Sequence, residues 1–130
     1  MLNPMTEFTV RLAHRPGMLA FLTEQMAEAG VNIEALAAYG VDGEGVVRVI
    51  VDDETLARKI FGRDNIEWEE RPALTTMLPH GSQGVAAMAR RLADANANIE
   101  AMYLLRSSAE GLEFAIVVDD HESAVDQLAV

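Results

Sequence analysis

The sequence contains the same short segment twice. Val-Asn-Ile-Glu-Ala at residues 31–35 returns as Ala-Asn-Ile-Glu-Ala at residues 97–101, a shift of 66 positions (97 − 31). The same shift carries His14 onto His80. It also carries four apolar positions with the spacing of one helical face, Leu19, Leu22, Met26 and Ala29, onto Val85, Met88, Leu92 and Ala95. One shift that holds across loop, helix and strand predicts two copies of one small unit, which constrains the fold more than any local pattern.

The size of the repeated unit limits how the chain folds. Half of 130 residues is 65, and a unit of that length buries too little surface to be very stable alone. Hydrophobic residues make up 50% of the chain, which is enough for a substantial core. We therefore expect the two copies to pack against each other or against a second chain.

Charge and composition exclude several classes of function. The net charge is −11, from 21 acidic and 10 basic residues, which disfavours nucleic acids and anionic membranes. The absence of cysteine excludes disulfides and thiolate metal sites. Residues 1–10 lack the basic and apolar regions of a signal peptide, and no apolar run approaches the roughly 18 residues of a membrane span. We expect a cytoplasmic protein that binds neither membranes nor nucleic acid.

In the first copy, the apolar pattern changes from that of strands to that of helices and back. Phe8 and Val10 alternate with polar neighbours, which is typical of a strand with one buried face. Pro16 suits the first turn of a helix because its missing N–H is not needed there. The expected elements are strands at 5–13, 31–40, 46–51 and 65–70, a helix at 18–29 ended by Gly30, and a helix at 52–60.

The second copy repeats this order but stops one element early. The expected elements are strands at 73–79, 97–107 and 112–118 and helices at 82–95 and 121–130. The order strand-helix-strand-strand-helix-strand is that of the ferredoxin-like fold, in which helices cover one face of an antiparallel sheet. The predicted fold class is α+β, with two ferredoxin-like (βαββαβ) units of which the second lacks its last strand.

The missing strand predicts an open sheet edge in the second unit. The fourth strand of this fold lies beside the first, so residues 74–78 would present unpaired backbone groups that recruit other strands. Three covers are open: residues 65–70 of the same chain, the matching strand of a second subunit, or a continuation of the chain. Because two marginal units with open edges favour two-fold pairing, we expect a homodimer.

Two motifs resemble those of the ACT domain. Residues 15–19 (Arg-Pro-Gly-Met-Leu) are similar to the family's Asp-x-Pro-Gly-x-Leu-like turn, and residues 29–33 (Ala-Gly-Val-Asn-Ile) to its Ala-Gly-Ile-Asn-Ile-like entry into the second strand. The resemblance covers residues 6–61 and, more weakly, 73–128. It implies a small stand-alone protein of two ACT domains, at 1–71 and 72–130, which are ferredoxin-like modules that mostly bind amino acids and often act in pairs.

The chain departs from the ACT pattern at both turns. Where the family often has an acidic or amide residue before x-Pro-Gly, the two copies have His14 and His80. This difference removes one anchor for a ligand's amino group and leaves the kind of ligand open. In the second copy, residues 80–84 (His-Gly-Ser-Gln-Gly) contain no proline, which predicts a looser loop.

The loops that enter the two predicted first helices are the candidate ligand sites. A helix N-terminus offers unpaired N–H groups and a positive dipole end to a carboxylate, and Gly17 or Gly84 allows close approach to the backbone. Asn32 and Asn98 both donate and accept hydrogen bonds, although asparagine and Pro-Gly are also ordinary turn residues. The candidate ligand-binding residues are His14, Arg15, Pro16, Gly17, Met18, Leu19, Asn32, Ile33, His80, Ser82, Gly84, Val85, Asn98 and Ile99.

Histidines and glutamates at equivalent positions favour simpler explanations than metal binding or catalysis. His14 and His80 lack carboxylate partners at ligand spacing, so we expect loop residues and no metal. Glu34 and Glu100 have no accompanying base or nucleophile, which favours a solvated strand face over paired catalytic acids.

Two further segments are explained without catalysis. The acidic pairs at 52–53 and 119–120 suit helix capping better than cation binding. Residues 81–85 (Gly-Ser-Gln-Gly-Val) are similar to the phosphate loop of acylphosphatases, but that chemistry needs an arginine shortly after the loop. The first basic residues here are Arg90 and Arg91, a full helical turn later.

The leading hypothesis is a non-catalytic regulatory or sensor module that binds a small amino acid or a related carboxylate, without metal or cofactor. The alternative is a structural or interaction protein that keeps the ACT fold without ligand binding.

Overall fold

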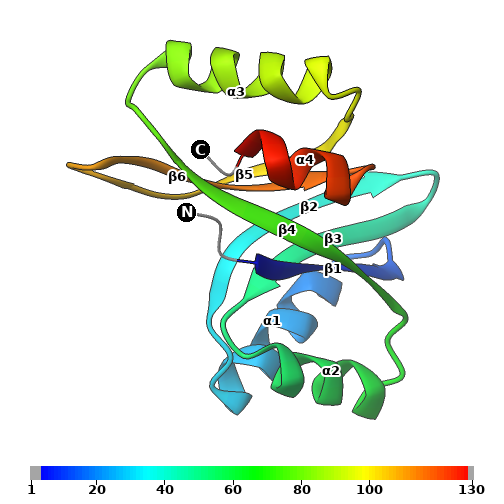
Figure 1. The fold of residues 1–130 in the computed structure, drawn as a ribbon. Coiled ribbons are helices and arrows are strands. Elements are labelled where there is room, and N and C mark those ends of the chain that lie inside the picture. The colour runs from blue at the N-terminus through cyan, green and yellow to red at the C-terminus, as the bar shows by residue number, and fades with distance from the viewer. Residues whose placement is uncertain (1–3, 129–130) are drawn as a thin grey trace. The chain divides into compact units, whose positions relative to one another are not determined.

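The computed structural model describes residues 4–128, which form two compact units (Figure 1). The N-terminal unit comprises Thr6–Arg71, and the C-terminal unit comprises the segment from Pro72 onward together with Pro4 and Met5. Each unit is an antiparallel sheet with helices, in the strand and helix order predicted from the repeat. The prediction of an α+β chain with two ferredoxin-like units is confirmed.

The N-terminal unit contains the elements from β1 to the start of β4. They are β1 (Pro4–Ala13), α1 (Met18–Ala29), β2 (Ile33–Val41), β3 (Glu44–Val51), α2 (Glu54–Arg63) and the first residues of β4 (Trp68–Leu78). The strand order is β2-β3-β1-β4, with β3 antiparallel to both β1 and β2. Gly45 of β3 lies opposite Leu12 on one side and Gly40 on the other. This register brings three strand ends together beside the loop that enters α1.

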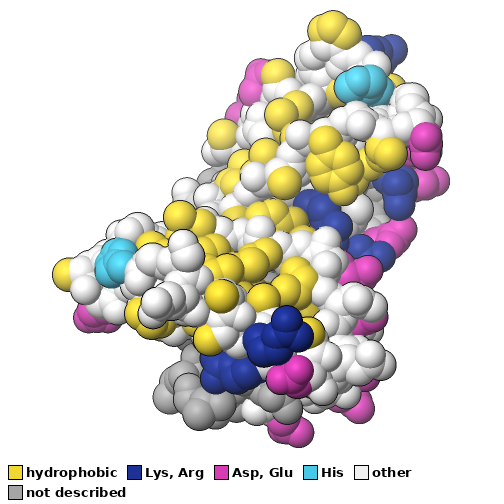
Figure 2. Space-filling view, turned by 90° about the horizontal axis from the view of Figure 1, so that it is seen from above, with side chains coloured by type: hydrophobic (Ala, Val, Ile, Leu, Met, Phe, Trp, Pro, Cys, Tyr) yellow, Lys and Arg dark blue, Asp and Glu magenta, His cyan; other side chains and the backbone are white. Residues whose placement is uncertain are grey.

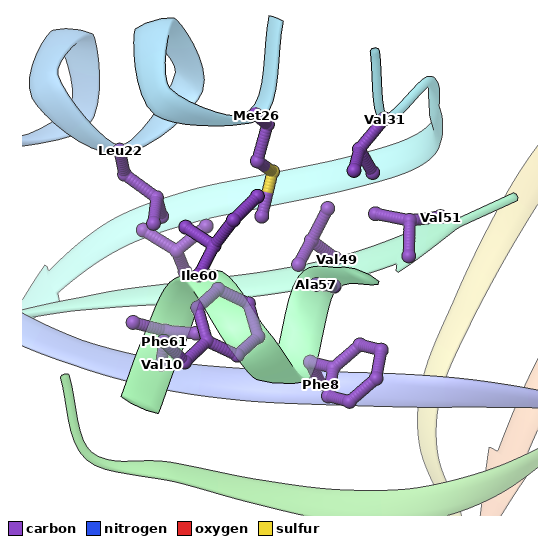
Figure 3. Close-up of a cluster of buried hydrophobic side chains, with 11 residues drawn as sticks. Phe8, Val10, Leu22, Met26, Val31, Val49, Val51, Ala57, Ile60 and Phe61 are labelled. Carbon is purple, nitrogen blue, oxygen red and sulfur yellow. The ribbon is translucent and has the colours of Figure 1, made fainter. Parts of the chain in front are cut away.

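The core of the N-terminal unit lies between the sheet and helices α1 and α2. Leu22 and Met26 are four residues apart, so they share one face of α1, and both are almost fully buried. Figure 3 shows both side chains pointing from α1 toward the sheet and toward Ile60 of α2. The rings of Phe8 and Phe61 meet edge to face, with centroids 5.5 Å apart.

The two helices of the N-terminal unit begin in different ways. Helix α1 follows Gly17, which has a φ of 91° and offers no side-chain cap, and it ends at Gly30 with a φ of 81°. Both values lie in the left-handed region that favours glycine. Helix α2 begins at Asp53, whose Oδ1 accepts a hydrogen bond of 3.0 Å from the Leu56 N–H. The free N–H groups of α2 are therefore partly satisfied within the protein, whereas no side chain caps α1.

The C-terminal unit repeats the plan with the rest of the chain. Its elements are the second part of β4, α3 (Ser82–Asp94), β5 (Ile99–Ser108), β6 (Gly111–Val118) and α4 (His121–Leu128). Residues 129–130, the end of the helix predicted at 121–130, lie outside the described residues. β6 pairs antiparallel with β4 and with β5. The core contains Leu74, Leu78, Met88, Leu92, Ala97, Ile116, Val118 and Ala124.

One continuous strand replaces two predicted ones. The sequence predicts separate strands at 65–70 and 73–79, but β4 runs without a break from Trp68 to Leu78. Pro72 is tolerated because the pairing of β4 with β6 starts only at Leu74, so the missing N–H removes no bond from that ladder. Residues 65–70 therefore do not cover the edge of 74–78. In the strand order, β4 stands between β1 and β6. Pro4 and Met5 of β1 belong to the C-terminal unit.

Candidate functional site

A tight loop connects β1 to α1 in the N-terminal unit. The Arg15 N–H donates to the Ala13 carbonyl at 3.0 Å, and the Met18 N–H donates to the Arg15 carbonyl at 3.4 Å. A β-carbon on Gly17 would have no heavy atom within 4 Å, so this glycine is required by its backbone conformation and not by crowding. The space above Gly17 is open.

This loop forms one wall of a cavity of about 310 Å³, which we call the N-terminal cavity. Six of the sequence-predicted residues, His14 to Leu19, line it. The other lining residues are Leu12 and Ala13 of β1, Ala38, Tyr39 and Gly40 of β2, and Gly45, Val46 and Val47 of β3. Those from β2 and β3 were not singled out from the sequence. The strand order of the predicted fold was the available signal, because it places β3 between β1 and β2.

The His14 ring lies directly against the backbone of β2. A β-carbon built on Gly40 would lie 2.7 Å from both Cε1 and Nε2 of His14, which is closer than real β-carbons approach other atoms. Any residue other than glycine at position 40 would therefore displace the ring. Gly40 and His14 together shape one side of the N-terminal cavity.

The charges at this cavity favour an anion. Arg15 lies on its wall, with Nε 3.5 Å from Sδ of Met18 at the start of α1. No Asp or Glu lines the cavity among the described residues. The first turn of α1 also contains no acidic residue, whereas that of α2 contains Glu54 behind the Asp53 cap. The N-terminus of α1 and the Arg15 side chain therefore border a space that is lined by no acidic side chain among the described residues, which suits a carboxylate.

The predicted asparagines do not line the cavity. In the N-terminal unit, the N–H and Nδ2 of Asn32 both donate to the Asp52 carboxylate at 2.8 Å. In the C-terminal unit, the N–H and Nδ2 of Asn98 donate to Asp119 at 2.8 and 2.9 Å. Each unit thus contains the same asparagine–aspartate contact, which we call the clamp, and this contact connects the start of the unit's second strand to the end of its third. This geometry favours the structural explanation of the asparagines over ligand binding.

The clamps also change the titration of their carboxyl groups. The backbone hydrogen bond from Asn32, followed by its side-chain bond, lowers the pKa of Asp52. The side-chain hydrogen bond from Asn98, followed by its backbone bond, lowers the pKa of Asp119. The ionised carboxylate is favoured in both because each accepts two N–H groups.

These contacts correct the expectation that both aspartates of each acidic pair cap a helix. Only the second aspartate of each acidic pair caps a helix, through Asp53 to the Leu56 N–H and Asp120 to the Ser123 N–H. The first aspartate of each pair holds an asparagine instead. Ile33 and Ile99, at the starts of β2 and β5, are partly exposed and line neither cavity described here.

The corresponding loop of the C-terminal unit is built differently. Ser82 and Val85 line a shallow hollow of about 450 Å³ together with Gly81, Ala86 and Leu112. His80 does not line it, and its Nε2 lies 2.7 Å from the Ser108 carbonyl oxygen. The second loop therefore binds its own hairpin through the histidine.

Gly84 has a structural role that differs from the predicted one. A β-carbon there would lie 2.9 Å from Cδ of Pro79, so the glycine is needed for packing of the loop on α3. The prediction that Gly84 gives a ligand access to the backbone is therefore not supported by its position.

Other sequence features form no further site. Within residues 4–128, no three His, Asp or Glu side chains gather as metal ligands would. Glu34 and Glu100 are exposed on strands β2 and β5. None of the described helices has the length and apolar character needed to cross a bilayer.

At the level of sequence, neither a protein-family model nor a curated protein matches this chain. Solved structures do match. Protein BT0572 from Bacteroides thetaiotaomicron is 19% identical with a TM-score of 0.86, over 98% of this chain and 88% of that one. The ligand-free regulatory subunit of aspartate kinase from Thermus thermophilus is 17% identical with a TM-score of 0.69, over 99% and 91%. The same subunit from Thermus flavus is 16% identical with a TM-score of 0.63, over 99% and 94%. At these identities the likeness shows the fold, two ferredoxin-like units in tandem.

Proposed function

We propose that this chain is a tandem ACT protein and that its N-terminal cavity binds a small amino acid or a related carboxylate as a regulatory signal. One observation carries the proposal. The turn that resembles the ACT motif, residues 15–19, forms the wall of a cavity that combines a guanidinium, a helix N-terminus without a side-chain cap and an apolar lining. Solved proteins that share the fold include regulatory subunits of aspartate kinase, which supports a regulatory rather than a catalytic role.

The proposed module is non-catalytic. Among the residues that the structure describes, the N-terminal cavity is lined by no nucleophile next to a base, since the lining side chains with nitrogen or oxygen are those of His14, Arg15 and Tyr39. Binding at such a site would act by favouring one conformation or assembly of the protein, which requires a difference in affinity between two states.

The second candidate function is interaction without a ligand, and exposed apolar residues favour it. β2 is an outer strand of its sheet, and Leu36, Tyr39 and Val41 on it are 37%, 47% and 44% exposed. Figure 2, which views one face of the molecule, shows hydrophobic side chains at the surface in groups rather than singly. Such groups often mark protein interfaces.

The same outer strand supports the proposal of a homodimer. An outer strand carries a row of backbone groups without a partner in its own sheet, and apolar side chains on it add area that a second copy would bury. A two-fold axis next to β2 would place the interface beside Tyr39, which also lines the N-terminal cavity. Ligand binding and assembly would then be coupled.

Thermal unfolding in the presence of each of the twenty amino acids and of short carboxylic acids tests ligand binding. A ligand that binds only the folded form stabilises it by about 2.7 kcal/mol at 100 times its dissociation constant. Arg15→Gln should abolish the shift, whereas Arg90→Gln, which removes an exposed arginine from α3, should preserve it. If no compound shifts the unfolding temperature, the interaction function is the better explanation.

A further inference from the structure

The outer strands of the two units differ in how well their outer edges are protected. β2 and β5 stand at the two ends of the strand order, so among the described residues each has one edge without a partner strand. The register of β5 is interrupted twice, between Ile99 and Ala101 and between Leu104 and Arg106. Arg106 is also exposed, and it pairs with Glu113 at 2.7 Å. Irregularities and charges of this kind keep other strands from pairing with an edge.

β2 has neither protection over most of its length. Its register shifts only near its start, between Ile33 and Ala35. Residues 35–41, which we call the regular segment, read Ala-Leu-Ala-Ala-Tyr-Gly-Val and contain no charge and no proline. The large side chains of this segment are all exposed, namely Leu36, Tyr39 and Val41. An apolar edge without bulge or charge is one with which another strand pairs readily.

A second copy of the same strand fits this edge. A two-fold axis perpendicular to the sheet at Ala38, the middle of the regular segment, would pair the segment antiparallel with itself. Each large side chain would then lie opposite a small residue of the other copy: Val41 opposite Ala35, Leu36 opposite Gly40, and Tyr39 opposite Ala37. Facing residues on paired strands are close neighbours, so this alternation of large and small avoids crowding at the contact.

Like charges at the ends of this ladder do not prevent the pairing. Glu34 would come opposite Asp42 of the second copy, but both residues are exposed, and interactions between exposed charges are weak. An axis at Ala37 would separate these charges, but it would shorten the ladder at both ends because the register is broken before Ala35. The longer ladder about Ala38 is therefore favoured.

We infer that two copies of this chain pair through β2, antiparallel about a two-fold axis at Ala38, so that one sheet continues from the N-terminal unit of one copy into that of the other. The inference rests on the homodimer of the proposed function and names its strand and register. It also connects assembly to the proposed site, because Leu36 of the second copy faces Gly40, a lining residue of the N-terminal cavity. Each copy therefore adds a side chain next to the cavity of the other.

Single cysteine substitutions test the strand, because the sequence contains no cysteine. Ala38→Cys places two thiols opposite each other on the axis, with β-carbons about 4.5–5.5 Å apart, which is close to the separation in a disulfide. Oxidised glutathione should convert most of this variant into a covalent dimer on a non-reducing gel, and a reductant should reverse the change. Leu104→Cys, at an exposed position of β5, is the matched control and should not form a covalent dimer.

A mixture of Ala35→Cys and Val41→Cys tests the register. The two variants should crosslink with each other, and neither should crosslink with itself, because equivalent residues of the two copies lie about 20 Å apart. If sedimentation shows a dimer but Ala38→Cys does not crosslink, or Ala35→Cys crosslinks with Tyr39→Cys instead, the inference is wrong and the homodimer stands. If the unmodified protein is a monomer, the inference and the homodimer both fail, while thermal unfolding still decides ligand binding separately.

Discussion

The ion pair between Glu7 and Arg48 offers a sharp test of packing in the N-terminal unit. The side chain of Glu7 is 0% exposed and that of Arg48 is 14% exposed. Arg48 donates through Nε to Oε2 at 3.0 Å and through Nη2 to Oε1 at 2.9 Å. These two parallel bonds connect β1 to β3 on the sheet face opposite the Phe8 core, and their planar geometry suits the guanidinium.

Glu7→Gln keeps the size of the side chain but removes the charge that Arg48 faces. Breaking a buried ion pair by neutralising one partner costs about 3–5 kcal/mol, because the remaining charge has lost most of its hydration and no longer faces an opposite charge at that position. Arg48 retains slight exposure, so we expect the lower end, about 3 kcal/mol. For a chain of this size, such a loss lowers the melting temperature by roughly 10 °C.

Urea unfolding followed by tryptophan fluorescence measures this loss of stability in the N-terminal unit, which contains the ion pair. Trp68 is the only tryptophan, and its ring centroid lies 5.6 Å from that of Phe61 in the N-terminal core. The matched control is Glu69→Gln, whose carboxylate is 54% exposed and pairs with arginines at 3.4 and 3.7 Å. We expect that control to change stability by less than about 0.5 kcal/mol. If Glu7→Gln costs no more than Glu69→Gln, the argument from burial is refuted.

Three further predictions concern the site, the clamps and the assembly. Gly17→Val places a β-branched residue at a φ of 91°, which lowers the stability of the fold by roughly 1–2 kcal/mol. This variant should weaken ligand binding by more than it weakens folding, whereas Gln83→Ala should change ligand binding little. Equal losses of ligand affinity in titrations of the two variants would mean that the N-terminal loop is not the better ligand site of the two. The pKa values of Asp52 and Asp119 are lowered in the folded protein, so their ionised forms stabilise the fold at pH values above the ordinary pKa of about 4. This stabilisation is lost as the pH falls through the lowered pKa values of the folded state. The urea midpoint should therefore fall with acidification below about pH 4, and less steeply in Asp52→Asn; identical pH profiles would contradict this. Sedimentation equilibrium should report about twice the chain mass of 14.2 kDa, and a clean monomer at micromolar concentration would exclude the proposed homodimer.

Residues with local partners were predictable from the sequence. Leu22 and Met26 share a helical face because they are four positions apart, and the glycines at 17 and 30 mark the ends of α1 through backbone conformations that few other residues adopt. The loop at residues 14–19 was predicted as a site for the same reason, since a turn into a helix N-terminus is recognisable in one dimension. These features depend on neighbours within a few residues along the chain.

Residues whose partners lie on other strands were predicted less well. Glu7 and Thr9 have the alternation of an exposed strand face, but both are buried, with 0% and 5% exposure. Asn32 was expected to bind a ligand, and its donors are instead taken by Asp52, twenty residues later. The lining residues of β2 and β3 were missed because only the strand order and register bring Tyr39 and Val46 to the wall formed by the loop.

The sequence alone determined the repeat, the order of the elements and therefore the fold class, because periodicity and turn chemistry act between neighbouring residues and were present in two copies. Tertiary structure decided where the strands end, which polar side chains pair and what lines the cavity. β4 continues through Pro72 because its ladder with β6 begins beyond that residue. The different positions of the two equivalent histidines also appear only in the structure: His14 lies over Gly40 on the wall of the cavity, while His80 reaches Ser108. A side chain's partner depends on register across strands that are distant in sequence, and local patterns do not specify that register.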